Sequence, residues 1–111
     1  MSIGSFHFKN QMFVCDSWPI FSVHFPNKPI LPGFMQLLWV REVIENSTPA
    51  RSIGSFSSVK FIKPITPSQT MMLYIQDKSN FVDFFISLLM TNTVEENIAT
   101  KGSFFIRSKD P

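Results

Sequence analysis

The residues best suited to chemistry lie between His24 and Gly33. His24 ends an apolar stretch, Pro26, Pro29 and Pro32 follow it, and Gly33 opens a segment rich in helix-forming residues. An imidazole titrates near neutral pH, so this histidine is suited to act as a general base. Amides in the first turn of a helix lack internal acceptors, so we expect those of Gly33, Phe34 and Met35 to favour an oxyanion. The pattern therefore predicts a base beside an oxyanion site, where Gly33 leaves room for a substrate carbonyl.

This segment resembles the active-site motif of the hot-dog-fold β-hydroxyacyl thioester dehydratases of fatty-acid synthesis. Their pattern runs His-Phe-Pro, then Pro and Pro-Gly at fixed offsets before a helix, and His24-Phe25-Pro26, Pro29 and Pro32-Gly33 match it. The stretch 59–67 is similar to the family's third strand, where an aromatic residue precedes a proline-containing turn. The segment 29–39 looks most like the compact dehydratase-like proteins of aryl-polyene and related lipid pathways.

The resemblance implies roles for three residues. His24 would remove a proton alpha to the thioester carbonyl, and the amides of Gly33 and Phe34 would hold the carbonyl oxygen as negative charge develops. The substrate would be a 3-hydroxyacyl thioester, carried on the phosphopantetheine of an acyl carrier protein or on CoA. No bound cofactor and no metal site are implied, and the sequence has no cluster with metal-ligand spacing.

The helix departs from the family at Leu38, where the dehydratases carry an Asp or Glu that protonates the departing hydroxyl. An aliphatic side chain cannot transfer a proton. Glu42 stands one turn further along, and residues four apart share a helix face. Our hypothesis is that Glu42 supplies the acid while Leu38 packs against the acyl chain. The alternative is that Arg41, Glu42 and Glu45 form a solvated polar face.

Three functions follow from this departure. The retained His24 and the Pro32-Gly33 helix entry favour a hydro-lyase that dehydrates 3-hydroxyacyl thioesters in fatty-acid or polyene lipid biosynthesis. Leu38 favours a non-catalytic subunit that binds acyl thioesters or completes a mixed dimer with an active partner. A thioesterase is the third reading, although no carboxylate lies next to His24 or at Leu38 to activate water.

Basic residues near the motif are candidates to receive an acidic carrier protein. They are Lys28, Arg51, Lys60 and Lys63. Scattered lysines are equally typical of a solvated surface. Elsewhere, the alternating polarity around His7 predicts a solvent-facing side chain, and Cys15 has no evident activating base.

Composition limits the fold to one small domain, residues 1–111. The 111 residues include 44% hydrophobic residues and thirteen Phe, a load of large side chains that disordered chains lack. A net charge of +2 gives no indication of nucleic-acid binding. The apolar stretch 81–90 is about half the roughly 20 residues that a membrane span needs. With a lone Cys15 and no signal-peptide pattern at the start, we expect a cytoplasmic protein.

The elements needed to position the motif are strands around one helix. Alternation and turn residues predict strands at 5–14, 20–25, 51–65, 70–78, 81–93 and 98–107, and a helix at 33–46. Together with the resemblance, this implies an α+β hot-dog fold, with a curved antiparallel sheet of five to six strands wrapped around one long central helix. The helix is apolar over most of its circumference, so we expect burial on nearly all sides and a homodimer or a mixed dimer.

Overall fold

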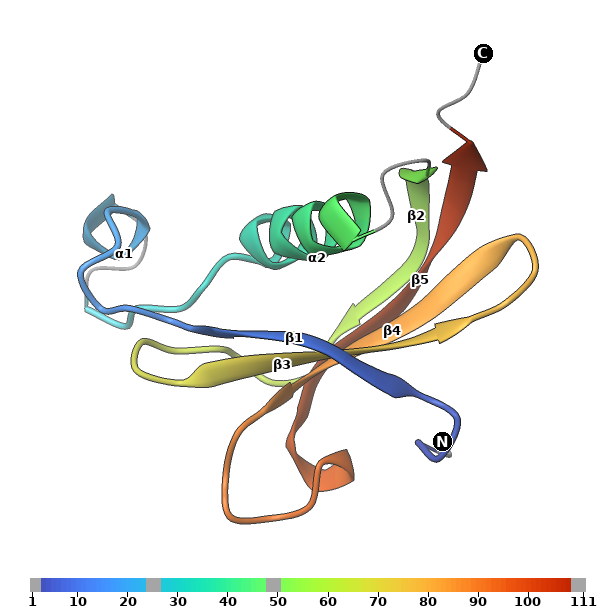
Figure 1. Cartoon of the computed structure of the whole chain (residues 1–111). Coiled ribbons are helices and arrows are strands. Elements are labelled where there is room, and N and C mark those ends of the chain that lie inside the picture. Colours follow the sequence, from blue (N-terminus) through green and yellow to red (C-terminus); the bar gives the residue numbers. More distant parts are fainter. Residues whose placement is uncertain (1–2, 24–26, 48–50, 109–111) are drawn as a thin grey trace.

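The computed structural model describes residues 3–23, 27–47 and 51–108, and it contains one five-stranded antiparallel sheet with a helix across one face (Figure 1). The strands are β1 (His7–Phe13), β2 (Arg51–Phe61), β3 (Thr70–Asp77), β4 (Phe81–Leu88) and β5 (Ile98–Ser108). The helices are α1 (Ile20–Val23), α2 (Gly33–Ser47) and the 3₁₀ turn η1 (Glu95–Asn97). The strand order is β1-β3-β4-β5-β2, and every pairing is antiparallel. The α+β class expected from the sequence is confirmed.

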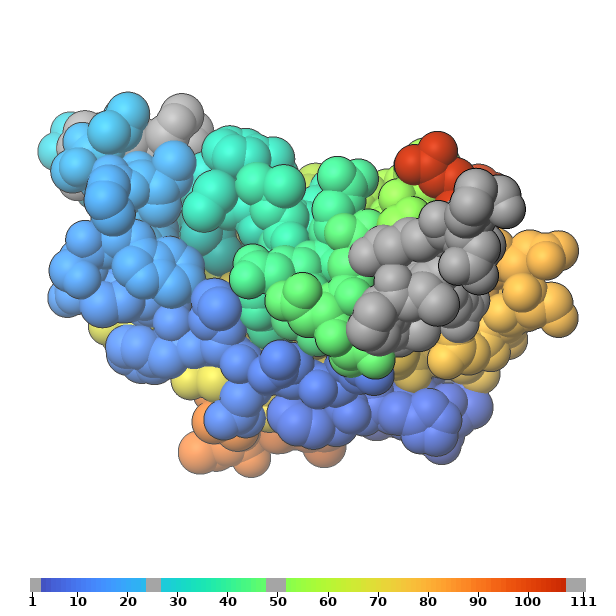
Figure 2. All heavy atoms as spheres, turned by 45° about the horizontal axis from the view of Figure 1, so that its top comes forward, coloured from blue at the N-terminus to red at the C-terminus, as the bar shows by residue number. Residues whose placement is uncertain are grey.

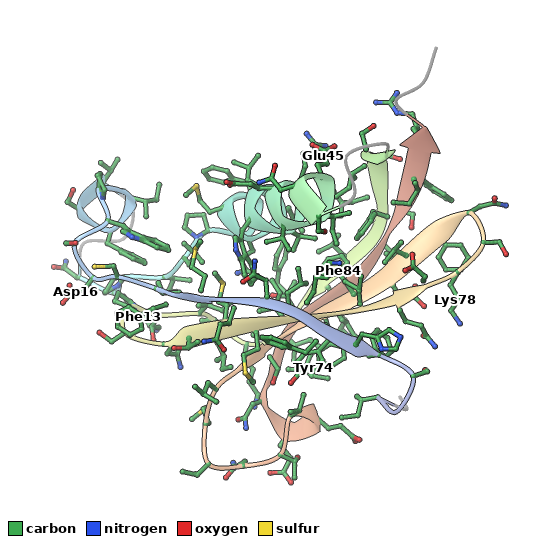
Figure 3. The ribbon with its side chains drawn as sticks, in the orientation of Figure 1. Phe13, Asp16, Glu45, Tyr74, Lys78 and Phe84 are labelled. Carbon is green, nitrogen blue, oxygen red and sulfur yellow. The ribbon has the colours of Figure 1, made fainter. Side chains whose placement is uncertain are left out.

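Alternation along the strands gives the sheet two different faces. Leu73 lies opposite Ile86 and Ile75 lies opposite Phe84 in the β3–β4 pairing, and all four side chains are buried in the core. Figure 3 shows Phe84 on the side of the sheet that carries α2, and Tyr74 on the far side. The hydrophobic core therefore lies between the sheet and α2.

The far face of the sheet also carries aromatic rings. Tyr74 stacks on Phe85 with ring centroids 4.8 Å apart, Phe8 meets Tyr74 edge-on, and Phe6 lies over Phe85 at 5.0 Å. Phe85 is fully buried by these neighbours. The heavy phenylalanine content therefore serves both faces of the sheet, not only the core.

Helix α2 begins where the prolines end. The amides of Met35 and Gln36 both donate to the Pro32 carbonyl, and Ser47 at the other end donates its hydroxyl to the carbonyls of Val43 and Ile44. The side chains of Trp39, Val40, Val43 and Ile44 are buried.

Burial of α2 on nearly all sides, as expected from the sequence, is wrong for the single chain. Phe34 is 55% exposed and Leu38 is 53% exposed. The core lies on one side of α2 only, and these two residues form an apolar stripe on the outside of the helix.

Residues 20–23 form helix α1, so the strand predicted there is wrong. The Phe21 amide donates to the Trp18 carbonyl, and both the amide and the hydroxyl of Ser22 donate to the Pro19 carbonyl. Proline suits the start of a helix because its missing N–H is not needed there, and these local bonds outweigh the strand propensity of the apolar residues. The sheet therefore has five strands within the part of the chain that the structure describes.

β2 and β4 end four and five residues earlier than predicted, and each ends at a local break. β2 ends at Phe61 because the amides of Ile62 and Lys63 both turn to the Ala99 carbonyl and Pro64 has no amide to donate. β4 ends at Leu88, where the Ser87 hydroxyl donates to the Val94 carbonyl and fastens the loop that follows. Among the described residues, no helix combines the length and the apolar character needed to cross a membrane.

Candidate functional site

A largely apolar cavity of about 340 Å³ lies between α2, β1 and the neighbouring loops. Among the described residues, its lining is formed by Met12, Trp18, Leu31, Met35, Leu38, Trp39, Glu42 and Met71. Figure 2 shows the exposed side of α2 next to the β1 segment, where the cavity lies. Seven of these eight residues are apolar, and Glu42 alone carries an ionisable side chain. The cavity can hold an apolar group beside one carboxyl.

Leu38 and Glu42 meet in this cavity because they lie one turn apart on α2. Glu42 also lines a second cavity of about 320 Å³, which Lys9, Asn10 and Met12 of β1 share. Glu42 therefore lies between an apolar space and a more polar one. Leu38 contributes an aliphatic wall to the apolar space, half exposed to solvent.

The start of α2 carries two amides that have no acceptor among the described residues, those of Gly33 and Phe34. The amides of Met35 and Gln36 bond to the Pro32 carbonyl, so the free amide expected at Met35 is not found. Such orphan donors are the usual source of anion binding at a helix start. Neither Gly33 nor Phe34 lines the apolar cavity.

The open space expected beside Gly33 is filled by the ring of Phe61. A β-carbon at position 33 would lie far inside normal contact distance of Cζ of that ring. Glycine at this position therefore lets the end of β2 pack against the start of α2. The phenyl ring is 51% exposed, so its outer half faces solvent.

His24 lies outside the described residues, together with Phe25 and Pro26, so its distance from α2 stays a prediction. The part of the same loop that follows is described as far as α2. Leu31 is 2% exposed, and its amide donates to the Ile65 carbonyl at 2.7 Å. The end of the proline-rich loop is thus fastened to the β2–β3 connection, and Leu31 forms part of the cavity wall.

Sequence reasoning missed Gln36, which is 3% exposed inside α2. Its Oε1 accepts a hydrogen bond from the Thr100 hydroxyl at 2.5 Å, and its Nε2 donates to the Leu31 carbonyl at 3.4 Å. The sequence did carry a signal, because Gln36 is the one amide side chain in the apolar run 34–40. A buried polar group requires hydrogen-bond partners, so such a residue predicts a buried polar contact.

The basic candidates do not gather at one cavity. Lys60 lines a cavity of about 510 Å³ with Asp83 and Ser103, whereas Lys63 lines another of about 280 Å³ and donates to the Glu96 carbonyl at 2.5 Å. Lys28 is exposed, and the side chain of Arg51 lies outside the described part.

The remaining candidates form no reactive cluster. His7 is exposed, as predicted, and Cys15 is half-buried with its Sγ 3.0 Å from the Ser17 hydroxyl. Within ranges 3–23, 27–47 and 51–108, no three His, Cys, Asp or Glu side chains are grouped closely enough to hold a metal ion.

Comparison with known proteins gives one family and several similar structures. The family model of the ApeI-like proteins, described as ApeI dehydratase, matches residues 5–101. A chain of the dehydratase heterocomplex ApeI:P from Xenorhabdus doucetiae is 27% identical, with a TM-score of 0.73, 86% of this chain covered and 82% of that one. No curated protein matches the chain.

Two further structures are similar in fold alone. An uncharacterized protein from Erwinia carotovora subsp. atroseptica is 24% identical, with a TM-score of 0.77 and coverage of 94% and 93%. An acyl-CoA hydrolase from Staphylococcus aureus is 15% identical, with a TM-score of 0.64 and coverage of 96% of this chain and 66% of that chain. These similarities agree with the hot-dog fold that the His24 motif implied.

Proposed function

This chain belongs to the ApeI-like dehydratase family, and from that premise we propose that it dehydrates a 3-hydroxyacyl thioester to an enoyl thioester. His24 takes the proton from C2, and the electron pair left behind forms the C2=C3 double bond. The C3–O bond breaks as Glu42, acting as the general acid, gives a proton to the hydroxyl, which leaves as water. Proton exchange with solvent then resets both side chains.

The observation that carries this proposal is the cavity beside α2. It combines walls of leucine, methionine and tryptophan with one carboxyl, which is the combination that an acyl chain with one reacting hydroxyl requires. Leu38 packs against the acyl chain at the place where the family carries its acid. Glu42 reaches the same space from the next turn.

The thioester carbonyl needs donors as negative charge develops on its oxygen. The free amides of Gly33 and Phe34 supply them in this proposal, since both lack an acceptor among the described residues. The half-exposed ring of Phe61 beside Gly33 must turn outward to admit the carbonyl.

A second hot-dog subunit completes the molecule in this proposal, either a copy of this chain or a related one. The apolar stripe of Phe34 and Leu38 on α2 is more than half exposed in the single chain, and burying it would remove apolar surface from water. The similarity to a chain of the ApeI:P heterocomplex supports a mixed pair. The substrate arrives on the phosphopantetheine of an acyl carrier protein, or on CoA, in a cytoplasmic lipid or polyene pathway.

The second candidate function is a non-catalytic subunit that binds acyl thioesters for an active partner. Leu38 favours it, because loss of a positioned acid typically costs about 10² to 10⁴ in rate. The cavity would then hold the acyl chain, and Glu42 would have no part in proton transfer.

The purified chain, incubated with 3-hydroxyacyl and enoyl carrier-protein thioesters, distinguishes the two functions. Mass spectrometry of the carrier protein follows an 18-dalton loss or gain, with His24→Ala as the control. Interconversion that disappears in His24→Ala supports the dehydratase. Saturable binding without interconversion, by the chain alone, supports the accessory subunit, and release of free carrier thiol would support a thioesterase.

A further inference from the structure

Gln36 and Thr100 form a buried polar contact between helix and sheet. Their side chains are 3% and 0% exposed, and the Thr100 hydroxyl lies 2.5 Å from Oε1 of Gln36. Thr100 is in β5, opposite Ile86 of β4 and Phe61 of β2. The bond therefore joins the first turns of α2 to an inner strand of the sheet.

A directional bond at this place restrains the rotation of the first turns of α2 about the helix axis. The middle of the helix packs on the sheet through Trp39, Val40, Val43 and Ile44, and apolar contacts have no preferred direction. A second directional bond, from the Ile53 amide to Glu45, lies at the far end of the helix. A hydrogen bond weakens steeply when its angle changes. Rotation of the helix would separate Gln36 from Thr100 and leave two buried polar groups without partners.

The same side chain also fastens the loop before the helix. Nε2 of Gln36 donates to the Leu31 carbonyl at 3.4 Å, and the Leu31 amide donates to the Ile65 carbonyl at 2.7 Å. Leu31 is thereby held through both of its backbone polar groups. It is also a wall of the apolar cavity.

We infer that Gln36 is a positioning residue that sets the shape of the apolar cavity, and through it the acyl chain that the cavity accepts. Four lining residues lie on α2, namely Met35, Leu38, Trp39 and Glu42, and a fifth is Leu31. Gln36 positions the four residues on α2 by restraining the rotation of the helix. It positions Leu31 through its hydrogen bond to the Leu31 carbonyl. The inference rests on the proposed function in naming an acyl ligand. The hydrogen bonds of Gln36 to Thr100 and to the Leu31 carbonyl, called the clamp below, do not depend on that function.

The test uses variants that remove the clamp at either end. Gln36→Met keeps a similar length and loses both hydrogen bonds, and Thr100→Val loses the hydroxyl at nearly constant volume. Thr100→Ser keeps the donor. Asn97→Leu is the matched control, because Asn97 is equally buried at 3% and bonds through Nδ2 to the Thr93 carbonyl at 2.9 Å, away from the cavity.

Two readouts separate positioning from general loss of stability. The first is kcat/KM, or affinity if the chain only binds, for a series of acyl thioesters of increasing chain length. The second is hydrogen exchange at the Leu31 amide relative to exchange at the strand amides, which requires no activity.

We expect Gln36→Met and Thr100→Val to change the preferred chain length and to lower kcat/KM for the preferred acyl group about 10- to 100-fold. Both variants lower relative protection at Leu31, Thr100→Ser restores the wild-type pattern, and Asn97→Leu keeps it. An unchanged chain-length profile with unchanged Leu31 protection in Thr100→Val would overturn the inference. So would an Asn97→Leu profile that shifts in the same way. If the wild-type chain neither converts nor binds acyl thioesters, the proposed function fails, and Leu31 exchange still decides whether the clamp exists.

Discussion

Leu38 and Glu42 line one cavity from successive turns of α2, and only Glu42 can carry a proton. In the resembling dehydratases the acid stands where this chain has Leu38. In this chain the apolar wall and the carboxyl therefore lie on successive turns of the helix. Substitution of Glu42 therefore tests whether this arrangement supports dehydration.

Replacement of Glu42 by Gln removes the proton donor while keeping the size of the side chain. We expect kcat to fall by about 10² to 10⁴, because that is the usual contribution of a positioned general acid. Substrate affinity stays within about threefold by this account, since binding comes from the apolar walls. Steady-state kinetics with a 3-hydroxyacyl thioester gives both numbers.

Glu45→Gln is the control for that experiment, because Glu45 lies on the same helix but does not line the apolar cavity. Its turnover should equal that of the wild type. Equal turnover of Glu42→Gln and the wild type would reject Glu42 as the acid and leave it as part of a solvated face.

Gly33→Ala tests the contact between the start of α2 and the end of β2. The added methyl group would clash with the Phe61 ring, and overpacking of this kind typically costs about 1 to 3 kcal/mol. In a Phe61→Ala background the same change should stabilise the chain by about 0.4 to 1 kcal/mol, since alanine has less freedom than glycine when unfolded. Urea unfolding of the four proteins measures this coupling. Equal effects in both backgrounds would show that the ring does not occupy this space.

Glu45 anchors the last turns of α2 to β2, as its position in Figure 3 indicates. Its Oε2 accepts a hydrogen bond from the buried Ile53 amide at 3.0 Å. Glu45→Ala leaves that amide without an acceptor, and we expect a loss of about 1 to 3 kcal/mol in the free energy of unfolding. Glu45→Gln keeps an oxygen acceptor and should cost less. Equal losses for the two variants in chemical denaturation would contradict this role.

The outer stripe of α2 predicts association. We expect the wild-type chain, alone or with a related subunit, to have a solution mass at least twice its 12.8 kDa. Phe34→Lys places a charge in the stripe and should shift the mass toward the monomer without unfolding the chain. Phe13→Lys is the control, because Phe13 is similarly exposed at 56% but lies on β1. Light scattering after gel filtration gives the masses, and a wild-type monomer that forms no mixed pair would contradict the prediction.

Much of this fold could be predicted because its signals are local. The stretch Thr70–Asp77 was predicted as a strand because turn residues flank it on both sides, and Pro32 followed by Gly33 marked the helix start. Residues 20–23 were misjudged because their apolar, partly β-branched composition also suits a strand. The hydrogen bonds from Ser22 to the Pro19 carbonyl stabilise the helix instead. They form only in the turned conformation, so the pattern of apolar residues does not reveal them.

The candidate site was harder to predict from the sequence, because its contacts join distant parts of the chain. Helical spacing alone brought Leu38 and Glu42 together. The packing of Phe61 on Gly33 spans 28 positions and depends on where β2 ends, and the bond from Thr100 to Gln36 spans 64. Such pairs depend on strand register, which the pattern of polar and apolar residues does not specify for a helix packed across the sheet.

The most direct test is hydration of an enoyl carrier-protein thioester in deuterium oxide. If the chain catalyses reversible dehydration with His24 as the base, the 3-hydroxyacyl product carries one deuterium at C2, and His24→Ala forms neither the product nor the label. A wild-type chain that binds the enoyl thioester but leaves it unlabelled and unhydrated, alone and with a related subunit present, would contradict the account.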